Sequence, residues 1–90
     1  MRTVAFTVDK TGLKAYWLTI GKKDVKLVNG KGTMDLETGP HIAVWYMQGN
    51  AGAKLSISGT LKDGTEVLSV KDSKIPGGRS KWADVKPFSV

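Results

Sequence analysis

Hydrophobic and polar residues alternate along most of this chain, in short runs that end at turn residues. Val4, Phe6 and Val8 alternate with small or polar residues, which predicts a half-buried strand. Two other runs, 13–20 and 41–48, carry large apolar residues on both faces of the predicted strand. Such strands are normally covered on both sides, so these two indicate a surface that something else covers.

Turn signals separate the runs at regular intervals. Asn29-Gly30 and Asp63-Gly64 each stand between two strand-like runs and predict hairpins, because asparagine, aspartate and glycine tolerate the backbone of tight turns. Gly59 occupies an inward position, where a bulge or a large neighbour is expected. The strands predicted from this pattern are 3–8, 13–20, 24–28, 32–36, 41–48, 54–61, 65–70 and 79–90.

The pattern therefore predicts an all-β fold. No window repeats its apolar residues every three to four positions, so no substantial helix is expected. Ninety residues form one domain spanning 1–90. About seven to eight short strands fit a small antiparallel β-sandwich, with a small barrel as the alternative.

Composition narrows the class of protein. Hydrophobic residues make up 40% of the chain and charged residues 24%, which is not the composition of a disordered segment. The absence of cysteine excludes disulfides, thiolate zinc sites and a cysteine nucleophile. The net charge of +6 favours either solubility or an anionic partner.

No segment resembles a membrane span or a signal-peptide core. The longest apolar run, 42–47, is far shorter than the roughly 20 residues that cross a bilayer. A cytoplasmic location is expected if the chain is full length, and secretion if a signal peptide has been removed.

The sequence shows no group of polar residues whose types and spacing suit catalysis. His41 is the single histidine, and it follows a glycine-proline turn without a second histidine or cysteine nearby. The acidic residues are not clustered as a calcium loop requires. We therefore expect no catalytic residues, no metal site, no cofactor and no enzymatic activity.

Aromatic residues are the most informative group. Trp17, Trp45 and Trp82 either fill a thin core or offer flat rings to a ligand, and for the first two the core interpretation is favoured. Consecutive residues of a strand point to opposite faces, so Tyr16-Trp17 and Trp45-Tyr46 cannot each place both rings in one core. Trp82 follows Arg79-Ser80-Lys81 and is expected to be the most exposed of the tryptophans. The predicted ligand or partner surface consists of Tyr16, Tyr46, Arg79, Lys81 and Trp82.

The segment Leu36-Glu37-Thr38-Gly39-Pro40-His41-Ile42-Ala43-Val44 resembles bacterial immunoglobulin-like and PEGA-type β-sandwich modules. In those modules a leucine, a glycine and a histidine or tyrosine open a strand, and a glycine turn follows, as Gly49 and Gly52 do here. The resemblance covers residues 35–59. It implies a non-catalytic binding or scaffolding role.

Three functions remain after these exclusions. The leading interpretation is a non-enzymatic interaction or assembly domain that acts through contacts with a protein partner or a second copy, because surplus apolar strand faces are typical of interfaces. The first alternative is a carbohydrate-binding module that uses exposed tryptophan and tyrosine. The second is a basic nucleic-acid-binding domain, from the positive charge and the cations beside Trp82.

Overall fold

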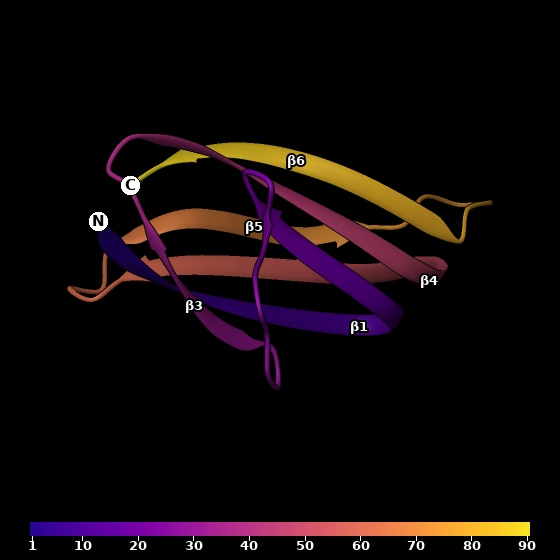
Figure 1. The fold of residues 1–90 in the computed structure, drawn as a ribbon. Coiled ribbons are helices and arrows are strands. Elements are labelled where there is room, and N and C mark those ends of the chain that lie inside the picture. Colours follow the sequence, from indigo (N-terminus) through magenta and orange to yellow (C-terminus); the bar gives the residue numbers. More distant parts are fainter.

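The computed structural model describes residues 1–90 as an all-β protein without a helix. All six strands belong to one antiparallel sheet. They are β1 (Arg2–Ile20), β2 (Lys23–Asp24), β3 (Lys31–Leu36), β4 (Pro40–Leu61), β5 (Glu66–Lys74) and β6 (Lys81–Ser89). The molecule is elongated, 41 × 22 × 19 Å, and both termini lie at the same end of it (Figure 1).

β1 and β4 form the frame of the fold. They pair with each other along nearly their whole lengths, from Val4 opposite Leu61 to Ile20 opposite Ala43. Each strand bends near its middle, where the pairing register shifts around Leu13. The sequence predicted four separate strands here, and the breaks between them are bends within two continuous strands. This is why the structure has six strands instead of the predicted seven to eight.

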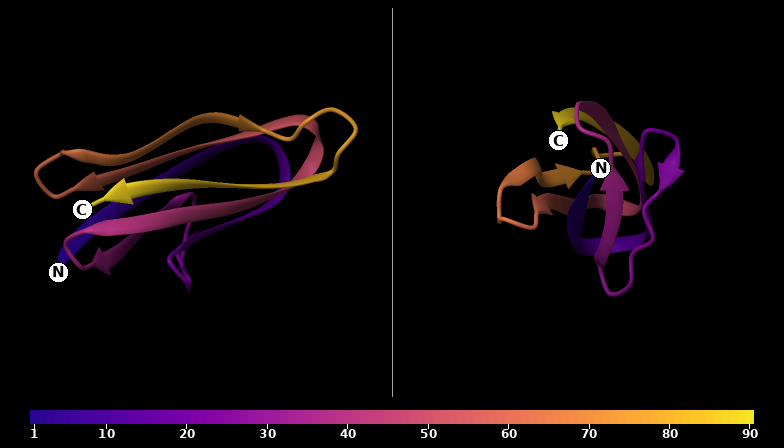
Figure 2. Two further views of the ribbon diagram at one scale, coloured as in Figure 1. Left: turned by 90° about the horizontal axis from the view of Figure 1, so that it is seen from above. Right: turned by 60° about the vertical axis from the view of Figure 1, so that its left-hand side comes forward.

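The bends fold the sheet over, so that its two halves face each other (Figure 2). We call the halves layer A and layer B. Layer A has the strand order β3-β1-β4-β5 and layer B the order β2-β1-β4-β6. Layer A uses residues 2–11 of β1 and 54–61 of β4, and layer B uses 13–20 of β1 and 40–49 of β4. The strands of a sandwich form two separate sheets, whereas here β1 and β4 run through both layers and all six strands belong to one sheet, so the predicted sandwich is not confirmed.

Glycine makes the bends sterically accessible. Gly12 adopts a φ of +74°, which disfavours residues with a Cβ atom. Gly49 approaches the facing strand so closely that an added Cβ would lie 2.9 Å from the carbonyl oxygen of Gly12 and 3.2 Å from the Cα of Leu13. The two long strands can therefore turn together at this end of the molecule.

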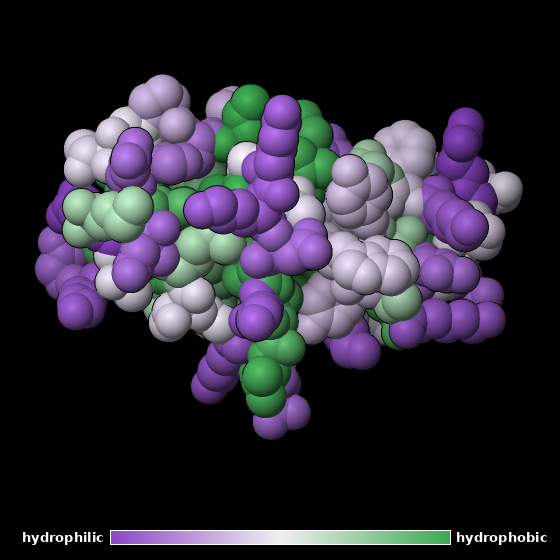
Figure 3. All heavy atoms as spheres, in the orientation of Figure 1, coloured by the Kyte–Doolittle hydropathy of each residue, from purple (hydrophilic) through white to green (hydrophobic).

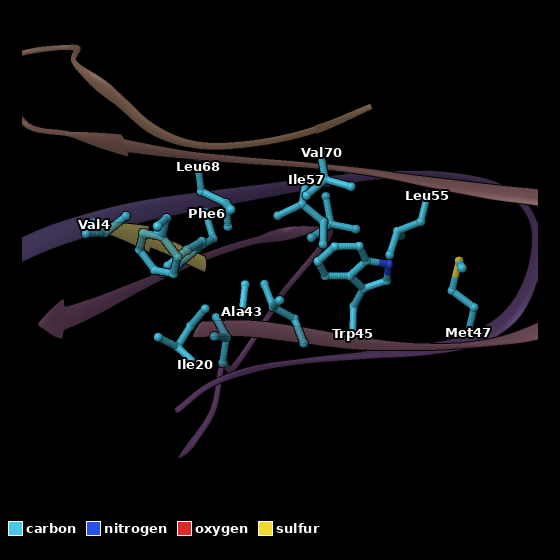
Figure 4. Packing of buried hydrophobic residues seen from close by; sticks show 14 of the residues in the cluster. Val4, Phe6, Ile20, Ala43, Trp45, Met47, Leu55, Ile57, Leu68 and Val70 are labelled. Atoms are coloured by element: carbon cyan, nitrogen blue, oxygen red, sulfur yellow. The ribbon is translucent and has the colours of Figure 1, made fainter. Parts of the chain in front are cut away.

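The core lies between the two layers and is entirely apolar. Figure 4 shows Trp45 of layer B pointing toward Leu55 and Ile57 of layer A. The indole Nε1 of Trp45 donates a hydrogen bond of 3.0 Å to Ser73 Oγ, so the one polar atom of this ring is satisfied. Gly59 is buried beside the ring of Phe6, as predicted, and the β4–β5 register shifts directly after it.

Both predicted hairpins are present. Asn29 and Gly30 have φ values of +54° and +76°, as a type I′ turn requires, and Val28 and Lys31 exchange two backbone hydrogen bonds across them. In the second hairpin only Gly64 has positive φ, and the turn is longer than two residues. The strand predicted at 24–28 is wrong in extent, since only Lys23–Asp24 pairs with β1.

No helix of the structure could cross a membrane.

Candidate functional site

The outer surface of layer B carries large apolar side chains that no part of the chain covers. The antiparallel register places Trp17 of β1 opposite Tyr46 of β4, and Tyr46 opposite Ala83 of β6. One row further along the strands, Val44 lies opposite Val85. Because side chains alternate between the faces of a sheet, these residues share one surface. We call it the apolar face, and it consists of Trp17, Ile42, Val44, Tyr46, Ala83 and Val85.

Exposure of this surface is high. Trp17 and Ile42 are each 53% exposed, Tyr46 is 46% exposed and Val85 is 57% exposed. Their neighbours on the same strands, such as Ala43 and Trp45, are buried. The strand pattern predicted this alternation, with Ile42, Val44 and Tyr46 on one side and Ala43, Trp45 and Met47 on the other.

One end of the apolar face continues into an open pocket of about 470 Å³. Three of its lining residues are aromatic and two are cationic; the full lining is Trp17, Tyr46, Met47, Gln48, Arg79, Lys81, Trp82 and Ala83. The Arg79 guanidinium carbon lies 5.7 Å from the centre of the Trp82 ring, a cation–π distance. We call this the aromatic pocket. It combines flat apolar rings with positive charge and contains no carboxylate.

Four of the five residues predicted as a ligand or partner surface line this pocket. Tyr46, Arg79, Lys81 and Trp82 come together there because β6 pairs with the first half of β4. Tyr16 does not join them. Its ring lies 5.5 Å from Lys10 Nζ, and it faces the inner side of β1, where Leu18 and Ile20 are buried.

The tryptophans differ from expectation in two ways. Trp17 was favoured as a core residue, but it is the most exposed of the three, whereas Trp45 is buried as predicted. Trp82 was expected to be the most exposed, but it is half-buried against the core. Alternation along the strand could have shown that Trp17 points outward. Trp17 shares its face with the polar Thr19, whereas the apolar Leu18 and Ile20 point inward.

Charge is distributed unevenly along the molecule. The end opposite the termini, which we call the tip, is formed by residues 10–17, 46–55 and 72–82 (Figure 1). The loop from β5 to β6 is tied there by backbone hydrogen bonds from Gly49 to Ser80 and from Gly52 to Ile75. The basic residues of the tip are Lys10, Lys14, Lys54, Lys74, Arg79 and Lys81, and its one acid is Asp72.

Asp72 leaves most of that positive charge unbalanced. Its carboxylate lies 3.6 Å from Lys54 Nζ, so it is engaged by one of the six cations. In Figure 3 pale aromatic rings gather on the right of the molecule, directly beside the purple hydrophilic side chains of that end. The aromatic pocket therefore opens in a positively charged part of the surface.

The remaining candidates for chemistry lie elsewhere. The His41 ring packs 5.7 Å from the ring of Phe88, and its Nε2 donates a 2.6 Å hydrogen bond to the carbonyl oxygen of Glu37. No three histidine or acidic side chains come close enough to share a metal ion. The pKa of Asp63 lies below its usual value, because the backbone amide of Thr65 donates a hydrogen bond to its carboxylate in the β4–β5 turn.

Comparison with models of known protein families, with curated proteins and with solved structures finds no match for this chain. Its function must therefore be argued from its own surfaces.

Proposed function

We propose that this protein is a non-enzymatic interaction domain that acts through protein contacts made by its apolar face. The observation that supports this proposal is the set of exposed large apolar side chains on three adjacent strands, among them Trp17, Tyr46 and Val85. Small soluble domains rarely expose a contiguous surface of this kind unless it binds something. Because these side chains are about half exposed, removing the rest of each from water would contribute roughly half of the 1.5–3 kcal/mol that full burial of a large apolar side chain contributes.

A second copy of the chain is the partner that we propose first. The six side chains that define the apolar face are uncharged, and the nearest cations, Arg79 and Lys81, lie at its pocket end, so the centres of two faces could meet without bringing charges together. Most homo-oligomers pair the same surface of both copies about a two-fold axis, and a sheet face with no charge suits that arrangement. The binding or scaffolding role implied by the resemblance to immunoglobulin-like and PEGA-type modules agrees with this proposal.

The test is the molar mass in solution over a range of protein concentrations, measured by light scattering. We expect the mass to rise toward that of a dimer. The substitutions Ile42→Thr and Val85→Thr keep a β-branched side chain but remove apolar surface, and we expect them to weaken association. Val28→Thr is the matched control, because Val28 is also exposed but lies in the 28–31 hairpin, away from the face. A wild-type chain that stays monomeric throughout would contradict self-association.

Carbohydrate binding is the second candidate function. The rings of Trp17, Tyr46 and Trp82 line one pocket together with the amide of Gln48, and flat rings beside an amide suit the faces and hydroxyl groups of a sugar. A panel of oligosaccharides that shifts the tryptophan fluorescence would support it. No response from any sugar in the panel would contradict it.

A further inference from the structure

The tip carries a feature that the proposed function does not use. Self-association would bury the apolar face, including Trp17 and Tyr46, but it gives no role to the cations that lie beside these rings in the aromatic pocket. Arg79 and Lys81 line the pocket with three aromatic rings and without a balancing acid. A ligand that satisfies all of these groups has flat, stackable rings and negative charges close to them.

We propose that the tip binds single-stranded nucleic acid, with an unpaired base in the aromatic pocket and the neighbouring phosphates against Arg79 and Lys81. Proteins that bind single strands combine aromatic stacking surfaces with a positively charged path for the backbone. The aromatic pocket has both parts, because aromatic rings and cationic side chains line it together. The pocket volume of about 470 Å³ lies within the range of small-ligand sites.

Stacking partners in the pocket come from different strands. Trp17 and Tyr46 lie directly opposite each other on β1 and β4 and are both about half exposed. Trp82, on β6, is half-buried and has Arg79 near its ring face. A tryptophan or tyrosine side chain has only two χ angles to order, so little conformational entropy is lost when a base stacks on it.

Charge favours this ligand over the alternatives. A neutral sugar would use the rings but would leave Arg79 and Lys81 without partners. Duplex nucleic acid would use the cations, but its bases are already stacked and cannot reach the rings. The tip also carries Lys14 and Lys74, which add to the positive charge of this end of the molecule.

The primary test is fluorescence polarisation with a labelled oligothymidine of about 12 nucleotides, within the range of site sizes known for single-strand binders. We expect saturable binding that weakens steeply as salt rises, because bound phosphates release counterions. We also expect a duplex of the same length to bind at least about tenfold more weakly. Equal affinity for single strand and duplex would overturn the proposal.

Variants separate stacking from charge. Trp17→Ala should raise the dissociation constant about tenfold, while Trp17→Phe, which keeps a ring, should stay close to wild type. The double variant Arg79→Ala/Lys81→Ala should weaken binding and reduce the salt dependence by up to about two phosphate contacts. Its matched control is Lys26→Ala/Lys31→Ala, two exposed lysines outside the tip, which should have little effect.

Three results would contradict this proposal. One is an equal loss of binding in Arg79→Ala/Lys81→Ala and in its control Lys26→Ala/Lys31→Ala, which would indicate attraction by net charge alone. Another is unchanged binding in Trp17→Ala. A third is binding of an oligosaccharide of uronic acids without binding of the oligonucleotide, which would assign the pocket to an acidic sugar. Trp17 and Tyr46 belong to both the apolar face and the aromatic pocket, so these titrations are run in the Ile42→Thr/Val85→Thr background, where self-association is weakened and the rings stay accessible.

Discussion

Trp45 and Trp17 belong to the same residue type and to similar strands, but they have opposite roles. Trp45 is 3% exposed and hydrogen-bonded to Ser73, whereas Trp17 is 53% exposed. Trp45→Ala would leave a large cavity between the layers, so we expect a loss of about 3–5 kcal/mol in the free energy of unfolding. Trp17→Ala should cost less, about 1 kcal/mol, because this ring is half exposed and loses mainly its contact with the facing Tyr46. Urea denaturation followed by far-UV circular dichroism measures both values.

The stability of Trp17→Ala also decides whether this variant can be used in the binding experiments. A Trp17→Ala protein that remains fully folded under the binding conditions can be used to interpret a change in affinity. If Trp17→Ala were as destabilising as Trp45→Ala, the placement of the two rings on opposite sides of layer B would be wrong.

Gly49 is the single residue on which the bend depends most directly. A Cβ atom there would lie 2.9 Å from the carbonyl oxygen of Gly12, and that oxygen belongs to backbone that cannot move freely. We expect Gly49→Val to lower the free energy of unfolding by about 1–3 kcal/mol, as overpacking does elsewhere. Gly77→Ala is the control, because Gly77 has no atom within 4 Å of an added Cβ and no positive φ. A Gly49→Val protein as stable as Gly77→Ala would contradict the close approach of the strands.

Among the elements, the hairpin between β4 and β5 should respond to acid. The Asp63 carboxylate accepts a 2.9 Å hydrogen bond from the Thr65 amide, and this holds its pKa below the usual value. A lowered pKa means that the folded state favours the ionised form. The stabilisation is therefore present above about pH 4, the usual pKa of aspartate, and is lost as the pH falls below it.

The measurement is the difference in melting temperature between the wild type and Asp63→Ala. We expect the wild type to melt at the higher temperature at neutral pH and the difference to close below about pH 4. A difference that stayed constant across this range would show that the carboxylate charge at Asp63 does not contribute.

The sequence predicted the elements of the fold better than their connections. Asn29-Gly30 and Gly59 were interpreted correctly, because backbone freedom and the lack of a side chain are properties of single residues. The bend at Gly12 was read as a break between strands, since a glycine turn looks the same locally whether or not pairing continues through it. The continuity of β1 through this point depends on its long-range partner β4, which no local pattern contains.

For the candidate site too, single residues were predicted from the sequence, whereas their assembly depends on long-range strand pairing. Tyr46, Arg79, Lys81 and Trp82 were predicted from residue type and local spacing, and the pairing of β4 with β6 joined them. The other four lining residues were missed: Gln48 and Ala83 are neither aromatic nor charged, Trp17 was favoured as a core residue, and Met47 was predicted on the opposite side of its strand from Tyr46. Tyr16 was included because its strand looked covered on both faces, and local sequence could not show which aromatic of the pair Tyr16-Trp17 points outward.

For the whole molecule, the path of β1 and β4 has a consequence for cooperativity. Each strand passes through layer A and layer B, so neither layer consists of a separate stretch of chain. The core is likewise shared, because Trp45 of one layer packs on Leu55 and Ile57 of the other (Figure 4). Unfolding of one layer would expose the inner surface of the second and release half of each long strand. The two layers should therefore unfold together.

We expect a single two-state transition, with coincident urea curves from tryptophan fluorescence and far-UV circular dichroism. Fluorescence reports mainly on the surroundings of Trp45 in the core, whereas circular dichroism reports on all strands. Folding should take milliseconds to seconds, because partners such as Val4 and Leu61 are far apart in the sequence and must close a long loop before they pair. Two separated transitions would mean that one layer can exist without the other, and refolding within microseconds would contradict the role of the long-range pairing of β1 with β4.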